Sequence, residues 1–230
     1  MPYPKRNLET EVYQQQRIGD RDGDGRGRRG GTIDVDGEAS IEQVYGTDNF
    51  TIDVAYGKTL MTTATIVDNT LTLTGTGTVS RIVAEPSTIT DNGGTTVSEL
   101  AIQLVWFDSG GTFAWGGSGS GTITTLAIDC SHCFDEGVIN KVGTGTLTIA
   151  SGFPTRDQTT ASNYTGVKLD IDAGTVVLGS AGSNHDVTFN DDADEITVAS
   201  GATLTTYGTF SVRAAGTNVN LERPPDRRSI

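Results

Sequence analysis

The sequence predicts an all-β protein: a right-handed parallel β-helix, or β-solenoid, with one β-hairpin excursion and a flexible N-terminal arm. Two observations predict this fold. Short runs in which apolar residues alternate with threonine, serine or aspartate recur along the chain between glycine-rich turns, without helical periodicity. Only 35% of the 230 residues are hydrophobic whereas 30 are glycine, so the apolar residues must form thin, regular layers. The alternative is a β-sandwich or jelly roll, which tolerates irregular spacing between strands.

Residues 1–31 are expected to form an anchoring arm. The run GDRDGDGRGRRGG at 19–31 contains no apolar residue that a core could bury, so we expect a flexible linker there. The same run concentrates arginine in an acidic chain, and a local basic cluster of this kind commonly docks on another surface. The arm residues that we expect to make this contact are Arg26, Arg28 and Arg29.

The body is expected to span residues 32–215. Its first strand-like runs are TIDV, FTIDV and TLTL, and in each of them the apolar residues fall on one face. Ile52 lies 19 residues after Ile33, and Leu71 lies 19 residues after Ile52. We therefore expect these three residues to stack in successive coils.

The middle of the body carries both tryptophans of the chain. The runs LAIQLVWF at 100–107 and TFAW at 112–115 flank the turn-forming residues DSGG, which predicts a β-hairpin. Such a hairpin is either a local core that fastens itself to the solenoid or an interaction surface for a sugar or a neighbouring subunit. The aromatic residues that would form this surface are Trp106, Phe107, Phe113 and Trp115.

The alternating pattern resumes at residue 122 and is expected to be most regular between 143 and 180. Five positions taken as equivalent are separated by 24, 22, 18 and 23 residues, which suits coils that hold two or three strands each. These positions are Ile123, Leu147, Leu169, Val187 and Phe210. Residues 216–230 contain two prolines and three arginines and are expected to form an exposed C-terminal tail.

The charge of the chain restricts its partners. A formal net charge of −13 and a pI near 4.4 argue against a nucleic acid or an anionic membrane, because both require clustered cations. The sequence as given also contains no apolar run long enough for a secretory signal or a membrane helix. The chain is therefore expected to be synthesised and kept soluble in a host cytoplasm.

Motifs of catalysis are not found in the sequence. A Ser-His-Asp elbow, a P-loop and a dinucleotide fingerprint are all lacking, so we expect neither an enzyme nor a bound cofactor. Glycan cleavage would need two carboxylates at a fixed separation, which sequence alone does not reveal. Asp108 and Asp129 are the acids that lie nearest to the aromatic segment.

One short motif could hold a metal. Cys130, His132 and Cys133 in DCSHCFDE supply up to three soft ligands, whereas a structural zinc site needs four. A site shared around an oligomer axis would complete the set. The alternative is a pair of reduced or locally bridged cysteines at a turn.

The segment GTGTLTIAS…NYTGVKLDIDAGTVVLGSAG closely resembles the passenger-associated repeat of bacterial autotransporter adhesins. In that repeat a G-T-L-T-L strand, a Y-T-G turn and an A-G-T-L-V-L strand form coils of a right-handed parallel β-helix. The resemblance implies the same coil geometry here. The matching residues are Gly145, Leu147, Ile149, Tyr164, Gly166, Ile171, Gly174, Val177 and Leu178.

The overall layout also resembles that of bacteriophage virion proteins such as fibres, tail spikes and capsid decoration proteins, in which an N-terminal arm anchors a trimeric β body to the particle. This resemblance implies a homotrimer in the virion whose partners are the major capsid or a tail protein. It leads us to expect a non-enzymatic structural protein. The alternatives are a tail spike that binds or degrades a host glycan and a fragment of a bacterial surface adhesin.

Overall fold

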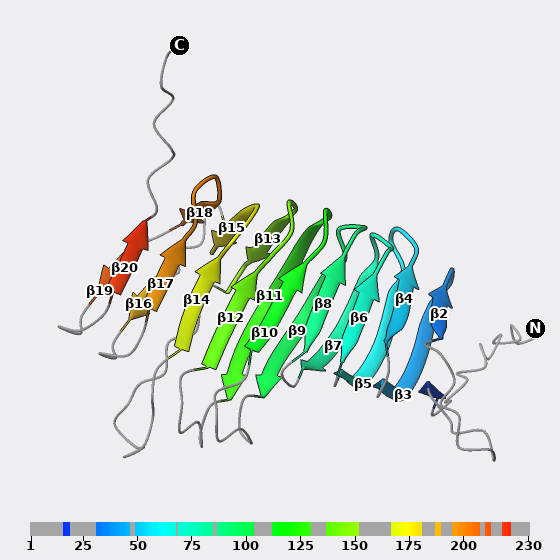
Figure 1. Ribbon diagram of the computed structural model, residues 1–230. Helices are drawn as coiled ribbons and strands as arrows, with labels where there is room; N and C mark the ends of the chain where they lie inside the picture. The colour runs from blue at the N-terminus through cyan, green and yellow to red at the C-terminus, as the bar shows by residue number, and fades with distance from the viewer. Residues whose placement is uncertain are drawn as a thin grey trace, which may run out of the picture.

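The computed structural model of the chain describes residues 16–18, 31–46, 49–67, 69–84, 87–103, 112–129, 137–151, 167–180, 187–189, 195–207, 210–212 and 218–221. Within these residues every regular element is a β-strand and every strand pairing is parallel. Figure 1 shows the strands stacked one after another along a single axis, in two long sheets. The predicted parallel β-solenoid is confirmed. The sandwich alternative is wrong, because a sandwich is built from antiparallel sheets.

Two nine-stranded sheets form the walls of the body, and the chain passes from one to the other in each coil. Sheet I contains, in order, β1 (Gln16–Ile18), β3 (Ala39–Gly46), β5 (Thr59–Val67), β7 (Thr78–Ala84), β9 (Thr96–Gln103), β11 (Ser120–Asp129), β13 (Thr146–Ile149), β15 (Thr175–Leu178) and β18 (Thr203–Thr206). Sheet II contains β2 (Thr32–Val35), β4 (Phe50–Val54), β6 (Thr70–Leu73), β8 (Thr88–Asp91), β10 (Thr112–Gly116), β12 (Gly137–Lys141), β14 (Val167–Ile171), β17 (Glu195–Val198) and β20 (Asn218–Leu221). A third sheet pairs β16 (Val187–Phe189) with β19 (Phe210–Val212).

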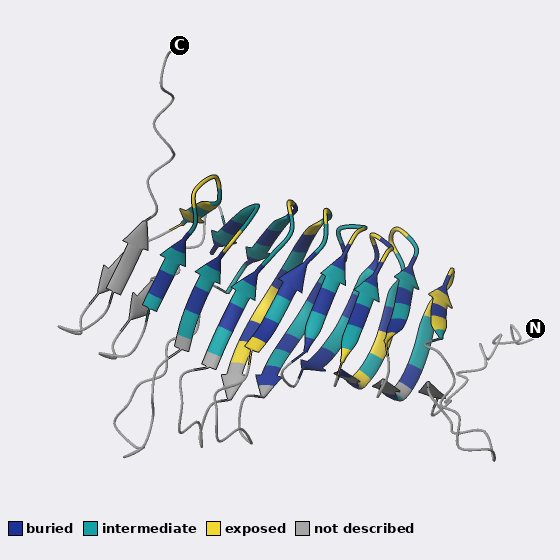
Figure 2. Ribbon diagram, viewed as in Figure 1, coloured by how far each residue is buried: buried dark blue, intermediate teal, exposed yellow. Residues whose placement is uncertain are grey.

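The core lies between sheets I and II and is built from columns of inward side chains. Because side chains alternate along a strand, one residue in two points inward, and the parallel register stacks these residues from coil to coil. Figure 2 shows the resulting alternation of buried and partly exposed residues along the strands. One such column in sheet II, in which no residue is more than 1% exposed, contains Leu71, Ile89, Trp115, Lys141 and Ile171.

The turn from sheet II to sheet I stays short along the body. It comprises residues 92–95 between β8 and β9, and residues 142–145 between β12 and β13. Glycine is required in these turns because their backbones stack closely. A Cβ atom at Gly145 would overlap the carbonyl oxygen of Gly119 in the preceding coil. A side chain there would therefore force the coils apart.

The opposite turn, from sheet I to sheet II, changes length along the body. Residues 68–69 join β5 to β6, whereas residues 150–166 join β13 to β14. The strands on either side keep their parallel pairing. The number of residues that join sheet I to sheet II therefore differs from coil to coil, which explains the irregular repeat length of the sequence.

The register confirms part of the predicted stacking and corrects the rest. Ile33 lies beside Ile52, as predicted, but Ile52 lies beside Leu73 rather than Leu71. The later series of five positions is wrong as a single column, because its members belong to three different sheets. Within it, Val187 does lie beside Phe210, in the third sheet. Strands pair in parallel from coil to coil before residue 122 as they do after it, so stacked coils are present from Thr32 onward.

The predicted β-hairpin around DSGG is wrong. β9 pairs with β7 and β11 in sheet I, whereas β10 pairs with β8 and β12 in sheet II. The two runs therefore lie in opposite walls. In a solenoid each strand is followed along the chain by a strand of the other sheet, so a glycine-rich turn between two strands does not imply that they pair.

Strands also occur beyond the predicted limits of the body. β1 lies within the expected arm, where it pairs with β3 and starts sheet I. β20 lies within the expected tail, where it pairs with β17 and ends sheet II. The body of the solenoid therefore extends past residue 215, the limit predicted from composition.

Candidate functional site on the outer faces and corners of the solenoid

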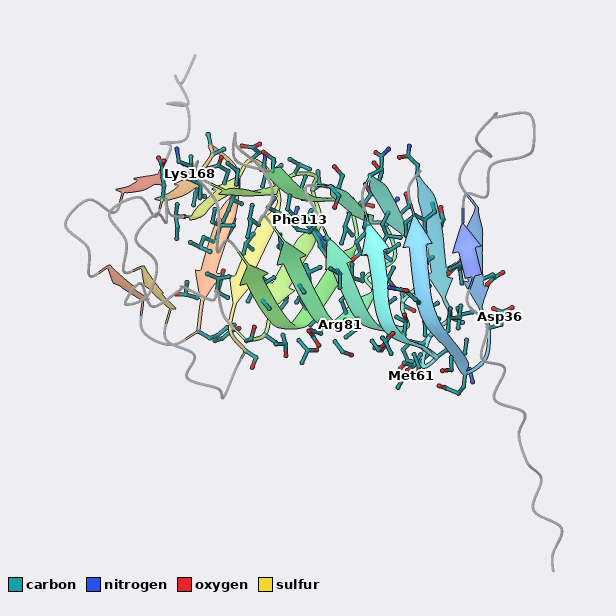
Figure 3. The ribbon with its side chains drawn as sticks, turned by 90° about the horizontal axis from the view of Figure 1, so that it is seen from below. Asp36, Met61, Arg81, Phe113 and Lys168 are labelled. Carbon is teal, nitrogen blue, oxygen red and sulfur yellow. The ribbon has the colours of Figure 1, made fainter. Side chains whose placement is uncertain are left out.

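The aromatic residues expected at an interaction surface are only partly described, and those that are described lie inside. Phe113 and Trp115 are each 1% exposed and rank among the largest fully buried side chains of the core. Figure 3 shows Phe113 between the two sheets. Neither side chain is accessible to a ligand, which corrects the expected surface and leaves the core alternative. Trp106 and Phe107 lie outside the described residues, as does Asp108.

Asp91 is a buried acid at the short corner between β8 and β9. Its Oδ1 accepts hydrogen bonds from the backbone amides of Gly93 at 3.2 Å, Gly94 at 2.8 Å and Thr95 at 3.2 Å. Its Oδ2 is buried without a hydrogen-bond partner. Burial raises the pKa of Asp91 above its ordinary value of 3.8, and the three amide hydrogen bonds oppose this rise. Asp91 thus provides a hydrogen-bond acceptor for three backbone amides of the corner. Burial of its carboxylate costs desolvation free energy in return.

Lys141 performs the complementary role at the corner between β12 and β13. Its Nζ donates to the carbonyl oxygens of Val142 at 2.9 Å, Gly143 at 2.7 Å and Ala173 at 3.3 Å, the last of which lies in the next coil. The side chain is 1% exposed, and burial lowers the pKa of its ammonium group. Lys141 therefore ties two coils together through their carbonyl groups.

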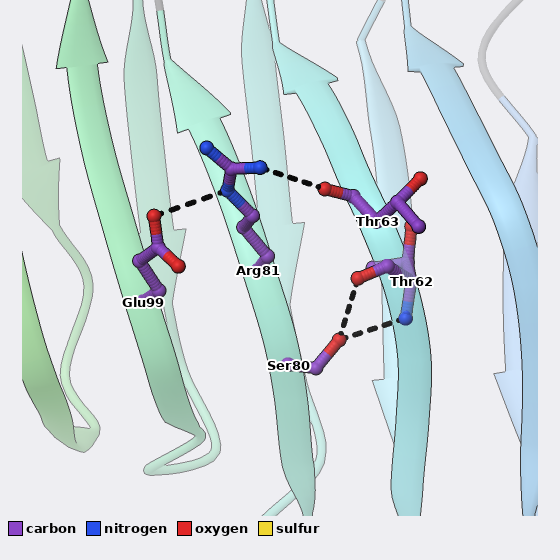
Figure 4. Close-up of polar contacts among 5 residues, drawn as sticks. All are labelled: Thr62, Thr63, Ser80, Arg81 and Glu99. Carbon is purple, nitrogen blue, oxygen red and sulfur yellow. Dashed lines mark hydrogen bonds and ion pairs between the residues drawn. The ribbon is translucent and has the colours of Figure 1, made fainter.

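A polar cluster joins β5, β7 and β9 on the outer face of sheet I (Figure 4). β5 contains two more residues than β7 between the pairs Leu60–Val79 and Ile66–Val83, so the ladder is interrupted there. Arg81 bridges the interruption, because its Nη1 donates to the carbonyl oxygen of Thr63 at 3.2 Å while its Nε lies 3.1 Å from Oε1 of Glu99. Figure 3 shows Arg81 and Met61 at the outside of this wall.

The outer face of sheet II carries a second polar cluster, on β14 and β17. Lys168 and Glu195 lie side by side in register and form an ion pair of 3.2 Å. Asp170 lies two residues further along β14, beside Thr197. Burial raises the pKa of Asp170, and the negative charges of Asp172 and Glu195 raise it further, whereas the hydrogen bond from Thr197 and the charge of Lys168 lower it. Burial is the largest of these effects, so the pKa of Asp170 lies above its ordinary value.

The metal and docking residues expected from the sequence cannot be placed. Cys130, His132 and Cys133 lie outside the described residues, as do Arg26, Arg28 and Arg29. Within the described ranges, no group of three or more histidine, cysteine, aspartate or glutamate side chains is arranged to hold a metal ion. The part of the chain that the structure describes also lacks any helix long and apolar enough to cross a membrane.

Asp91, Lys141 and Asp170 were not among the residues predicted to matter. The alternation of apolar and polar residues along the strands did contain a signal for Asp91 and Lys141. In TITD and GVINK, the acid and the lysine occupy the inward position of the pattern, where an apolar residue is expected. An ionisable residue at an inward position is rare enough to mark a structural or functional role. Asp170 follows the outward pattern, so no such signal existed for it.

Comparison with protein-family models, with curated proteins and with solved structures gives no significant match. The functional assignment therefore rests on the geometry and chemistry of the chain itself.

Proposed function

We propose that this protein is a non-enzymatic structural protein of a bacteriophage particle, either a capsid decoration protein or a fibre, and that it acts in the virion as a homotrimer. The observation that carries the proposal is the hydrophobic core cluster between the two sheets, which extends from Ile33 to Val198. Trp115 and Phe113, the two largest fully buried side chains, lie in this cluster, and the buried polar residues Asp91 and Lys141 interrupt it at the corners. A body built in this way suits a rigid spacer or brace.

The proposed arrangement assigns one role to each part of the chain. Nine stacked strands in each wall correspond to a rod of about 40 Å, since parallel strands lie about 4.8 Å apart. Arg26, Arg28 and Arg29 lie in the sequence between β1 and β2, the first strands of the two walls, so docking through them would attach this end of the rod to the major capsid or tail protein. The acidic body, in a chain with net charge −13, would then project from the particle and keep it soluble.

The test is whether the full chain is part of purified particles. Particles released by the host that carries the gene are banded on a density gradient and probed with an antibody raised against the recombinant chain. The expected result is co-migration with intact particles. A triple variant, Arg26→Ala with Arg28→Ala and Arg29→Ala, should fold normally and be lost from the particles, because it removes the docking charges.

The matched control removes three arginines from the other end of the chain, with Arg223→Ala, Arg227→Ala and Arg228→Ala. This control should stay bound to the particles. Absence of the wild-type chain from the particles would refute the virion assignment. Equal loss of both triple variants would refute docking through the arm, because it would indicate a general charge effect.

A glycan-cleaving tail spike is the second candidate, and the Asp170 cluster favours it. Glycoside hydrolysis needs one carboxyl group that holds a proton and a second that is ionised. Asp170, beside Asp172 and Glu195, has the raised pKa of the first. Reducing-end release from host surface polysaccharide by the wild type, lost in Asp170→Asn but kept in Asp53→Asn, would support this candidate. No release by the wild type would remove it.

A further inference from the structure

The outer face of sheet I carries a straight column of β-branched side chains. The parallel register places one residue of each of six consecutive strands of sheet I, from β7 to β18, directly beside the next. The column runs parallel to the axis of the solenoid. Its members are Thr78, Thr96, Thr122, Thr148, Val177 and Thr205.

A second column lies beside the first on the last four of these strands, two residues earlier along each strand. It consists entirely of hydroxyl residues: Ser120, Thr146, Thr175 and Thr203. The two columns form a flat grid with spacings of about 4.8 Å between strands and about 6.6 Å along each strand. We call these ten residues the hydroxyl face.

The hydroxyl face is uncharged, although the chain has a net charge of −13. The outer face of sheet II is different, because Asp34 lies beside Asp53 and the cluster of Asp170, Asp172 and Glu195 follows on β14 and β17. Two copies that met through sheet II would bring like charges together. Among the described side chains of the sheet I strands, the charged residues are Arg81 and Glu99, and these two pair with each other. Like-charged copies of this chain can therefore approach most closely through the hydroxyl face.

The side chains of the hydroxyl face are also available for contact. They are half-buried or exposed, and none of the ten makes a side-chain hydrogen bond within the described part of the chain. Each threonine offers a methyl group for packing and a hydroxyl group that both donates and accepts. Val177 places an apolar side chain in the middle of the face, at an outward position where a hydroxyl would be expected.

We propose that the hydroxyl face is the surface through which copies of this chain associate, with three solenoids side by side and their sheet I faces turned toward a common axis. The inference rests on the homotrimer of the proposed function and identifies its interface. Because the columns run parallel to the solenoid axis, each coil meets the same coil of its neighbours. Thr148 and Val177 of the three copies then converge at the axis, where hydroxyl pairs and methyl contacts hold them together.

The test compares two double variants with the same chemical change. Thr122→Glu with Thr148→Glu places two adjacent charges on the hydroxyl face, and Thr72→Glu with Thr90→Glu places two adjacent charges on the outer face of sheet II. All four threonines have the same intermediate burial. The mass of each protein is measured by light scattering and sedimentation across a range of concentrations, and its folding by thermal melting.

The expected mass of the wild type is three times that of the 24.1 kDa chain. The sheet I variant should dissociate to monomers or weaken association at least tenfold, whereas the sheet II variant should remain trimeric. A wild type that stays monomeric would refute both the trimer and its interface. A trimeric wild type whose assembly survives the sheet I charges would refute the interface alone, as would selective dissociation of the sheet II variant.

Cross-linking keeps the proposal testable if the charged sheet I variant fails to fold. In a Cys130→Ser, Cys133→Ser background, Thr148→Cys should give cross-linked dimers and trimers with a short bifunctional maleimide. Thr90→Cys should not. Cross-linking of Thr90→Cys alone, or of both variants equally, would overturn the assignment of the hydroxyl face.

Discussion

Ser80 and Thr62 are joined by two hydrogen bonds that replace a missing section of the sheet I ladder. The Oγ atom of Ser80 accepts from the backbone amide of Thr62 at 2.7 Å and donates to the carbonyl oxygen of the same residue at 2.9 Å (Figure 4). Both bonds lie within the interval where β5 has two more residues than β7. One hydroxyl group therefore provides Thr62 with the hydrogen bonds that a paired strand provides elsewhere, and the parallel pairing of β5 with β7 resumes beyond it with a register shifted by two residues.

Replacing Ser80 by alanine should destabilise the body. The substitution leaves the amide and carbonyl of Thr62 without these partners, and an unsatisfied backbone group costs about 1–3 kcal/mol when it is poorly hydrated. We expect the free energy of unfolding in urea to fall by about that amount. Ser98→Ala is the matched control, because Ser98 occupies the corresponding place on β9 and makes no side-chain hydrogen bond within the described residues; its effect should stay within about 0.5 kcal/mol. Equal losses in the two variants would contradict the bridging role.

Asp91 should make the stability of the protein depend on pH. Burial raises its pKa in the folded state above the ordinary value of 3.8, so the folded state holds the proton more strongly than the unfolded state does. The contribution of this group to stability is therefore complete below about pH 3.8 and is lost as the pH rises through the folded pKa. Asp91→Asn keeps an oxygen acceptor for the corner amides but cannot ionise. The stability of this variant should therefore not fall in this way as the pH rises.

The measurement is the free energy of unfolding in urea at several pH values between 4 and 7. The wild type should lose stability relative to Asp91→Asn as the pH rises. Asp34→Asn, which removes an exposed carboxylate instead, is the control for the loss of one negative charge. Parallel curves for wild type and Asp91→Asn would show that the desolvation of Asp91 is fully compensated by its amide hydrogen bonds.

Removing the ammonium group of Lys141 should loosen the corner between β12 and β13. Methionine retains most of the aliphatic chain but leaves the carbonyl oxygens of Val142, Gly143 and Ala173 without their donor. We expect Lys141→Met to lower the free energy of unfolding by about 1–3 kcal/mol. Lys168→Met breaks a partly exposed ion pair with Glu195 and should cost at most about 1 kcal/mol. A larger effect at Lys168 than at Lys141 would contradict the assignment of roles.

Adding one methyl group at the stacked corner should be poorly tolerated. A Cβ atom at Gly145 would overlap the carbonyl oxygen of Gly119, which is backbone and cannot rotate away. Gly145→Ala should therefore destabilise the protein by about 3 kcal/mol or more, as overpacking does in a rigid core. At Gly37 an added Cβ meets no atom within 4 Å, so Gly37→Ala should melt within a few degrees of the wild type. Thermal unfolding followed by circular dichroism distinguishes the two outcomes.

The inward positions within each strand could be predicted from the sequence, whereas the stacking of residues between coils could be predicted only in part. The inward positions of β13, β14 and β15 follow directly from the alternation in LTI, KLDI and TVVL, and they are confirmed. The stacking of Ile52 on Leu73 was missed by two residues, because a constant step of 19 was assumed. The number of residues between stacked positions depends on the length of the intervening turns. The residues of a turn carry little information about which strands will be neighbours.

The candidate sites were harder to predict than the fold. Phe113 and Trp115 were considered for a surface because a glycine-rich turn preceded them, yet the register of β10 places them in two neighbouring columns of the core. Asp91 and Lys141 could have been recognised as inward polar residues, and the amides that Asp91 binds lie within four residues of it. The carbonyl group of Ala173 that Lys141 binds could not have been foreseen, because it belongs to the next coil. The pKa of Asp170 is raised chiefly by burial, and Glu195, whose charge adds to this rise, lies on β17, 25 residues away in the sequence.

By itself, the sequence determined that this chain is all-β, that its strands are short and half-apolar, and which side of each strand faces the core. These properties are local, because the alternation of side chains along a strand has a period of two residues wherever the strand lies. Only the tertiary structure decided which strands are neighbours, where Ser80 must replace a lost pairing, and that the threonines of sheet I align into one uncharged face. Alignment between coils depends on the length of every intervening turn and on close backbone stacking at the glycine corner, which no single segment encodes.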